Sequence, residues 1–236
     1  MSFNYWLFVF ILFIVLFISV KKNKLTFAAA ITAAIVGLLI FMGTGFTGIA
    51  MIGLFFLLGT LATSFKINIK EKLGAAEINK GGRTVGQVLA NGGVAAIMGL
   101  LAWLYPNQLL VFEMMMAGAL ASATADTLSS ELGTVYGKKF YNIISFKIDR
   151  RGENGVVSLE GTIIGIGGSA LIAGVHALAT GWNNQFWWIV IAGTIGNLAD
   201  SILGATLERK RLIGNDVVNF INTMVSAFTI YLLMKL

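Results

Sequence analysis

The chain has 236 residues, of which 57% are hydrophobic and 12% are charged, and its mean hydropathy is +0.83. Soluble domains are usually about 45–50% apolar and about 25% charged, so this composition excludes an ordinary soluble protein. One proline and no cysteine exclude a disulfide scaffold and a cysteine-ligated metal site. The net charge of +6 comes from basic residues in short loops between apolar runs, so we expect no nucleic-acid partner.

Apolar runs long enough to cross a bilayer recur along the whole chain. A membrane helix needs about 20 mostly apolar residues. We predict eight such helices, at 3–20, 26–43, 46–64, 84–104, 108–128, 157–179, 185–206 and 214–234. The second and third are joined by Gly43–Gly45 alone, so they form either a helical hairpin or a re-entrant pair. The sequence thus predicts an all-α, polytopic transmembrane bundle, with a single membrane domain over residues 1–236.

The basic residues predict how the bundle is oriented. Sixteen of the seventeen lysines and arginines follow the first, third, fifth and seventh predicted helices, and the loops around Gly43, Pro106 and Gly181 have none. The positive-inside rule places the basic loops in the cytoplasm and the N-terminus outside the cell membrane. All five tryptophans lie at the predicted outer ends, as interfacial aromatic residues do: Trp6, Trp103, Trp182, Trp187 and Trp188.

Acidic residues lie in or beside the helix ends on the predicted cytoplasmic side. Charges at membrane depth are costly, and such acids are functional candidates by default. The set is Asp126, Glu131, Glu160, Asp200, Glu208 and Asp216. Two of them open similar strings, Ala-Asp-Thr-Leu and Ala-Asp-Ser-Ile, which suggests a weak internal repeat. Carboxylates and hydroxyls without histidine or cysteine suit Mg²⁺. The alternative is that these acids pair with Lys or Arg and stabilise the helix bundle. It is favoured for Glu208, which adjoins Arg209.

Two glycine-rich stretches, Asn79–Gln87 and Gly155–Thr162, precede the fourth and sixth predicted helices. Backbone amides at a helix N-terminus, with basic side chains nearby, form a natural anion site. For Ser158–Thr162 we favour phosphate binding, whereas the glycines from Gly165 onward are typical of close helix packing. Neither stretch is a Walker A motif. The last predicted helix has a polar face, which we expect to line the site: Asn215, Asp216, Asn219, Asn222 and Thr223.

Three strings in the chain resemble a known family. They are Asp126–Gly133, Gly137–Lys139 and Ser158–Thr162, and the patches Gly81–Thr84, Asn91-Gly92 and Asn197–Ser201 fit it as well. The family is the integral membrane family of plant phytyl-phosphate kinase and vertebrate transmembrane protein 19, whose bacterial and archaeal members mostly have a domain-of-unknown-function label. The resemblance covers the chain from about Thr26 onward. The order of the motifs is also similar to that of the CTP-dependent phytol and dolichol kinases.

The resemblance implies a Mg²⁺-dependent phosphotransferase. It would move a phosphoryl group from a nucleoside triphosphate, with CTP preferred, to a prenyl or phytyl monophosphate in the bilayer. Asp126, Glu131 and Asp200 would be catalytic and hold the metal. The phosphate- and nucleotide-binding residues would be Lys80, Arg83, Asn91, Lys138, Lys139, Ser158, Glu160, Gly161 and Thr162. The pocket would be lined by Ser130, Asn197, Ser201, Asn215 and Asp216.

Other functions remain open at this point. A CTP-dependent nucleotidyltransferase that makes a CDP-lipid would use the same parts, and only its product differs. A lipid or small-molecule transporter would also bury acids among glycine-rich helices, although its site is expected near the bilayer midplane. A purely structural membrane protein leaves the six acids unexplained. Isoprenoid chain length, CTP versus ATP and the number of metal ions stay open, and the glycine-rich faces suit either a homodimer or packing within one chain.

Overall fold

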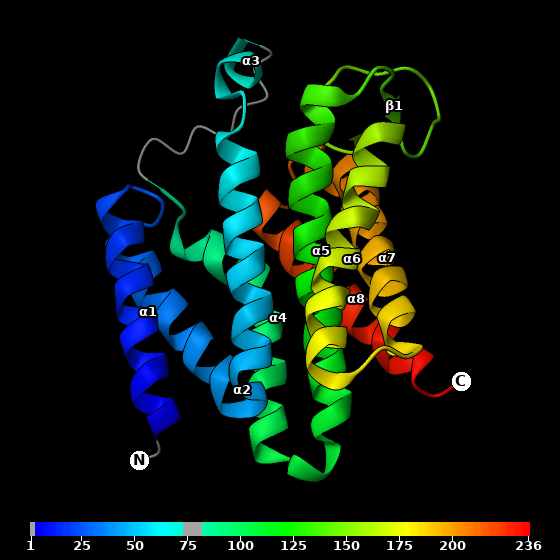
Figure 1. The fold of residues 1–236 in the computed structure, drawn as a ribbon. Helices are drawn as coiled ribbons and strands as arrows, with labels where there is room; N and C mark the ends of the chain where they lie inside the picture. The colour runs from blue at the N-terminus through cyan, green and yellow to red at the C-terminus, as the bar shows by residue number, and fades with distance from the viewer. Residues whose placement is uncertain (1–2, 73–81) are drawn as a thin grey trace.

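The computed structural model describes residues 3–72 and 82–236. Eight α-helices account for most of this part of the chain (Figure 1). They are α1 (Phe3–Lys21), α2 (Phe27–Ser64), α3 (Ile67–Lys72), α4 (Val85–Leu104), α5 (Leu109–Tyr136), α6 (Leu159–Thr180), α7 (Gln185–Leu203) and α8 (Asn215–Leu233). A 3₁₀ turn at Pro106–Gln108 precedes α5, and a π-helical turn at Gly204–Glu208 extends α7. The strands β1 (Tyr141–Asn142) and β2 (Val156–Val157) pair antiparallel in a small hairpin.

The eight predicted membrane segments are all helical in the described chain. Six helices are long and apolar enough to cross a membrane, and α1 is a shorter apolar helix. The second and third predicted segments form one element, α2, which breaks at Gly45 with φ 61° and ψ −141°. Figure 1 shows the chain reversing direction in α2, so its two halves form the helical hairpin that the sequence allowed. Each half covers about 27 Å at a rise of 1.5 Å per residue.

Helix α5 lies at the centre of the bundle, against α2, α4, α6, α7 and α8. Its stretch from Gly118 to Ala125 is buried all round and consists almost entirely of small residues. Small side chains let helix backbones approach closely, which is how membrane helices associate without a strong hydrophobic driving force. Several glycines of α6 and α7 serve the same packing: a Cβ on Gly165 would lie 2.7 Å from Nδ2 of Asn197. The predicted packing role of the glycines from Gly165 onward is confirmed for Gly165 and Gly168 and is wrong for Gly167, where a Cβ would meet nothing within 4 Å.

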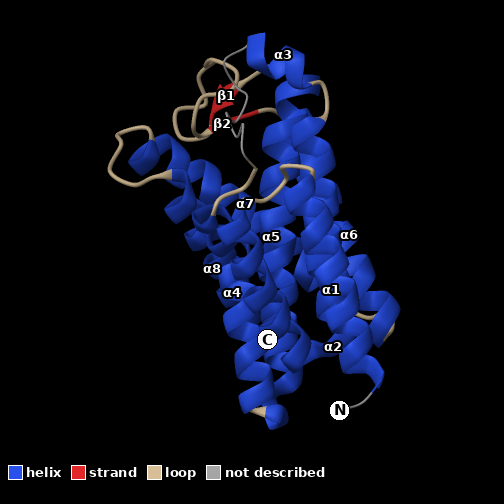
Figure 2. Ribbon diagram, turned by 90° about the vertical axis from the view of Figure 1, so that its left-hand side faces the viewer, coloured by secondary structure: helices blue, strands red, loops and turns tan. Residues whose placement is uncertain are grey.

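The connections alternate between the two ends of the bundle. The links between α1 and α2, between α5 and α6, and between α7 and α8 lie at the same end as α3, opposite the 3₁₀ turn that precedes α5 (Figures 1 and 2). These links and the last residue of α1, together with α3 and the residues beside it, contain the lysines and arginines of the described chain except Lys235, as the positive-inside pattern predicted. The chain is therefore a polytopic helical bundle whose basic connections gather at one end.

Candidate active site

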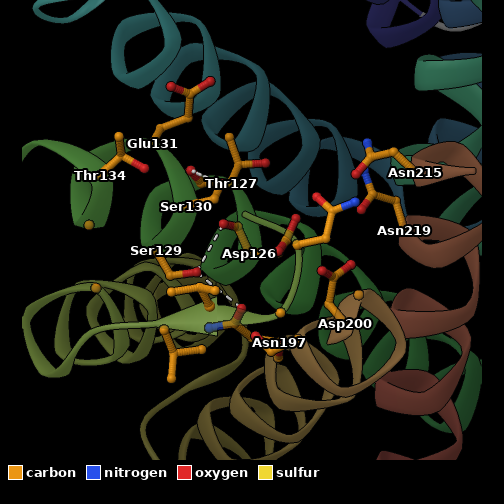
Figure 3. Close-up of a pocket in the computed structure, with 18 of the residues that line it drawn as sticks. Asp126, Thr127, Ser129, Ser130, Glu131, Thr134, Asn197, Asp200, Asn215 and Asn219 are labelled. Carbon is orange, nitrogen blue, oxygen red and sulfur yellow. Dashed lines mark hydrogen bonds between the residues drawn. The ribbon is translucent and has the colours of Figure 1, made fainter. Parts of the chain in front are cut away.

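A cavity of about 290 Å³ opens at the end of the bundle that has the basic connections. Its wall is built by α2, α4, α5, α6, α7, α8 and the β1–β2 hairpin (Figure 3). Among the residues that the structure describes, the wall has five carboxylates and one guanidinium: Asp126, Glu131, Glu153, Asp200, Glu208 and Arg83. Carboxamides fill much of the remaining wall: Gln87, Asn91, Asn154, Asn197, Asn215 and Asn219.

Asp126 of α5 and Asp200 of α7 form the centre of this wall. Their carboxyl groups are within hydrogen-bonding reach of each other, and Glu208 lies close enough to Asp200 for the two charges to interact. Helix α8 supports the pair from behind, because Nδ2 of Asn222 donates to Oδ2 of Asp200 at 2.6 Å. Carboxylates this close repel one another unless a cation or a proton lies between them. Either a bound cation or a shared proton would therefore stabilise this pair.

Asn219 adds a neutral oxygen to the same wall. Its side chain is 8% exposed and lines the cavity, and its Oδ1 has no hydrogen-bond partner among the described residues. A buried polar atom without a partner is costly, so such atoms in native proteins normally meet a ligand, an ion or a water molecule. Two carboxylates and a carboxamide oxygen make a set of hard oxygen donors, which is what Mg²⁺ binds. The residues present fit the metal that the sequence predicted.

Glu131 has a different partner. Nζ of Lys70 lies 2.5 Å from its Oε2 and also donates to the backbone oxygens of Ala62 and Thr63, at 2.7 and 3.1 Å. Lys70 is 1% exposed, so this ion pair ties α3 and the end of α2 to α5. Within the described chain no three His, Cys, Asp or Glu side chains come close enough to hold a metal together. The structure thus brings two of the three predicted metal ligands together and pairs the third with a lysine.

The polar groups of the Ser158–Thr162 turn are used within α6. Ser158 is the N-cap: its Oγ accepts from the Gly161 N–H at 3.1 Å, and the Thr162 hydroxyl donates to the Ser158 carbonyl at 3.0 Å. Gly161 faces Gly133 of α5 so closely that a Cβ on Gly133 would lie 2.8 Å from its Cα. Ser158, Gly161 and Thr162 line the cavity, but capping and close packing explain their positions without a bound phosphate.

The predicted basic residues separate into two groups. Arg83 lines the cavity, with its guanidinium 5.5 Å from the ring centres of Phe55 and Phe56. Lys138 and Lys139 are exposed and lie outside the lining, as does Glu160, which accepts from the Lys138 backbone N–H at 3.4 Å. The prediction for Lys80 lies outside the described residues.

The other predicted pocket residues mostly reach the cavity. Asn91, Ser130, Asn197, Ser201 and Asn215 line it, whereas Asp216 is exposed beside Gly86.

Several lining or supporting residues had not been predicted. Ser129 donates to Oδ1 of Asn197 at 3.1 Å (Figure 3), and the segment Gly152–Val157 closes one side of the cavity. Asn219 and Asn222 lie on the polar face that was predicted for the last helix: Asn219 lines the cavity, and Asn222 supports Asp200 from outside the lining. No pattern in the sequence pointed to the Lys70 ion pair or to the hairpin.

Comparison with known proteins gives several related membrane proteins. The chain is 32% identical to Protein VTE6, chloroplastic, of Arabidopsis thaliana over 216 residues, which cover 88% of this chain and 65% of that protein. It is 34% identical to an uncharacterized membrane protein of Methanocaldococcus jannaschii over 221 residues, or 93% and 90% of the two chains. A relative from Synechocystis, also an uncharacterized membrane protein, is 29% identical over 201 residues, or 83% and 77%. No solved structure matches.

The family model for integral membrane protein DUF92 matches residues 10–227, which is most of the chain. That match and the plant and archaeal relatives confirm the family that the sequence strings indicated. The chain belongs to the DUF92 family of integral membrane proteins.

Proposed function

We propose that this protein is a kinase that transfers a phosphoryl group from a nucleoside triphosphate, preferably CTP, to a prenyl or phytyl monophosphate. The observation that supports this most is the Asp126–Asp200 pair in a polar cavity at one end of an integral membrane bundle. The family resemblance to plant phytyl-phosphate kinase supports the same chemistry. A membrane lipid with a charged head meets the protein at this depth, since its tail stays in the bilayer and its head reaches the helix ends.

The donor set suits a divalent metal. Mg²⁺ usually binds one or two carboxylates and completes its shell with water and substrate phosphates. Asp126 and Asp200 would hold it, with Asn219 as the neutral oxygen beside them. Bound there, the metal would neutralise charge on the phosphates. Without such a cation, a wall with five carboxylates and one guanidinium among its described residues would repel a nucleoside triphosphate.

The chain's own side chains would do the positioning. Phosphoryl transfer depends mainly on alignment and on stabilising phosphate charge. Arg83 would pair with phosphate oxygens from the α4 side, since a guanidinium offers two parallel N–H donors. The carboxamides of the wall provide donors and acceptors for the rest of the nucleotide. The segment Gly152–Val157 would exclude water. The acceptor is itself a phosphate and therefore nucleophilic, so no residue is assigned as a general base.

The cavity would face the cytoplasm. Its end of the bundle has the basic connections, and nucleoside triphosphates are cytoplasmic substrates. A position at the helix ends also supports an enzyme over a transporter, whose site is expected near the midplane.

A product assay tests the proposal. Purified protein in lipid nanodiscs would be incubated with Mg²⁺, γ-labelled CTP or ATP, and prenyl monophosphates of several lengths. We expect label in a prenyl diphosphate, at least a hundredfold less with Asp126→Asn, and no change with Glu71→Gln, an exposed carboxylate on α3 outside the cavity. A folded wild type that labels no lipid would overturn the kinase. Label from α-labelled CTP in a lipid would instead identify a nucleotidyltransferase.

A further inference from the structure

The loop between β1 and β2 exposes three large apolar side chains at alternate positions. Ile144 is 50% exposed, Phe146 is 77% exposed and Ile148 is 81% exposed. We refer to residues 144–148 as the hairpin tip. They lie outside every helix that could span the membrane, so the lipid around those helices does not by itself account for them. Large apolar side chains gathered on a polar surface mark contact sites for a protein or a membrane.

The backbone conformation of the hairpin tip keeps these apolar side chains exposed. Oδ1 of Asn142 accepts from the backbone N–H groups of Ile144 and Ser145, both at 3.0 Å. The Asn142 carbonyl accepts from Phe146 N–H, and Asn142 N–H donates to the Lys147 carbonyl, both at 2.9 Å. Phe146 has φ 54°, a left-handed conformation that bulky residues rarely adopt. Such a conformation persists only where the surroundings hold it, so the tip presents its apolar side chains from a defined turn.

The tip is held beside the end of the apolar segment of α7. Asp149, next to Ile148, receives a hydrogen bond of 2.8 Å from Nη1 of Arg209, the first residue after the spanning segment Gln185–Glu208. That hydrogen bond holds the pKa of the Asp149 carboxyl below its usual range, so the pair stays ionised at neutral pH. Gly155 packs so closely on Ala205 that a Cβ would overlap the Ala205 backbone. The hairpin therefore lies against the helix end, and its loop extends beyond α6 and α7 in Figure 1.

The charge around the tip favours lipid over protein as its partner. Residues 137–157 contain five basic and two acidic side chains. Lys147 stands between Phe146 and Ile148 and is exposed. Apolar side chains interleaved with basic ones are typical of segments that lie in the headgroup layer of an anionic membrane.

We propose that Ile144, Phe146 and Ile148 insert into the headgroup region of the bilayer that holds the bundle, with Lys147 against anionic lipid. One wall of the cavity, Gly152–Val157, is then anchored at the boundary between lipid and water. This inference does not depend on the proposed kinase activity.

Spin labelling tests the insertion directly, because the chain has no cysteine and each introduced cysteine is unique. Labels at Phe146→Cys and Ile148→Cys, in nanodiscs containing anionic lipid, would be exposed to oxygen and to a water-soluble nickel complex. Oxygen partitions into lipid and nickel into water. We expect oxygen collisions to exceed nickel collisions at both positions, and the reverse at the control Glu71→Cys, an exposed acidic residue on α3 outside the cavity. Nickel accessibility equal to that of the control would overturn insertion and leave a protein partner to explain the tip.

A second label keeps the apolar side chains intact. Lys147→Cys reports the depth of the tip while Phe146 and Ile148 are native. We expect at least a twofold rise in its nickel accessibility when Phe146→Ser and Ile148→Ser are added. No change would show that these side chains do not anchor the tip and would also overturn the proposal.

Discussion

Asn222 on α8 donates a hydrogen bond of 2.6 Å to Asp200 on α7, and the orientation of its carboxamide is set from the other side by α5. Oγ of Ser122 donates to Oδ1 of Asn222 at 3.0 Å, so Nδ2 of Asn222 must face Asp200. Both Ser122 and Asn222 are fully buried. The three helices thus meet in a chain of hydrogen bonds that ends on one oxygen of Asp200. In the proposed enzyme, this chain would orient the carboxylate toward the metal.

Replacing Asn222 with leucine should therefore both weaken Mg²⁺ binding and lower the stability of the protein. A hydrogen bond to a charged group contributes about 1.5–3 kcal/mol, so Asn222→Leu should lower the unfolding free energy by that order. The Mg²⁺ concentration at half-maximal activity should rise several-fold. Ser122→Ala leaves Nδ2 of Asn222 in place but frees the carboxamide to turn. It should therefore raise the Mg²⁺ concentration at half-maximal activity less than Asn222→Leu does. Thermal unfolding and Mg²⁺ titration in nanodiscs measure both effects. Unchanged Mg²⁺ dependence in Asn222→Leu would mean that the network is only structural.

The Lys70–Glu131 ion pair predicts unequal effects for its two partners. Removing the lysine leaves a largely buried carboxylate uncompensated and takes a charged donor away from the carbonyls of Ala62 and Thr63. Breaking a buried pair in this way costs about 3–5 kcal/mol. Lys70→Met should therefore destabilise strongly, whereas Glu131→Gln keeps a neutral acceptor and should cost less. Urea or thermal unfolding of both single variants and of the double variant gives the coupling energy.

The same variants test whether Glu131 also holds the metal. If it does, Glu131→Gln should weaken Mn²⁺ binding, measured by electron paramagnetic resonance, while keeping most of its stability. If its role is structural, Mn²⁺ affinity in Glu131→Gln should match the wild type, and Asp126→Asn should still abolish binding.

The helices were predictable because each signal is local. Runs of apolar residues fix the spans, and Gly43–Gly45 marked the reversal inside α2, where Gly45 takes a positive φ. Alternating basic loops predicted which connections share an end of the bundle. Asp126 and Asp200 were found because a carboxylate in an apolar helix stands out wherever it lies.

The parts that were missed depend on contacts between distant segments. Lys70 meets Glu131 only because the α2 hairpin brings residues 61 positions apart together. In the sequence Lys70 is one more basic loop residue. Ser158 and Gly161 were assigned to phosphate because a helix N-terminus can bind an anion, yet the same N–H groups donate equally well to the hydroxyl oxygen of a capping serine. In this structure Ser158 caps the helix, and Gly161 packs against Gly133 of α5, which is a tertiary contact.

Gly161→Ala should separate close packing from simple helix propensity. A Cβ at Gly161 would lie 2.9 Å from the Ser129 carbonyl oxygen and 3.2 Å from Cα of Gly133, so α5 and α6 would have to move apart. Overpacking of this kind costs about 1–3 kcal/mol. Gly167→Ala on the same helix meets nothing within 4 Å and should be neutral or slightly stabilising, since alanine favours helix over glycine by about 1 kcal/mol. Equal melting temperatures for the two variants would contradict the close crossing.

Asn219 should show a trade-off between stability and function. Its buried Oδ1 lacks a partner in the described chain, and an unsatisfied polar group costs about 1–3 kcal/mol. Asn219→Leu removes that group, so the metal-free protein should unfold at a higher temperature than the wild type. The same change removes an oxygen from the proposed metal site, so Mn²⁺ affinity and phosphoryl transfer should both fall. Asn219→Asp restores an oxygen and should recover metal binding while lowering metal-free stability, because it adds a third carboxylate beside Asp126 and Asp200. A leucine variant that is less stable without metal, and equally active with it, would show that the amide has a structural partner instead.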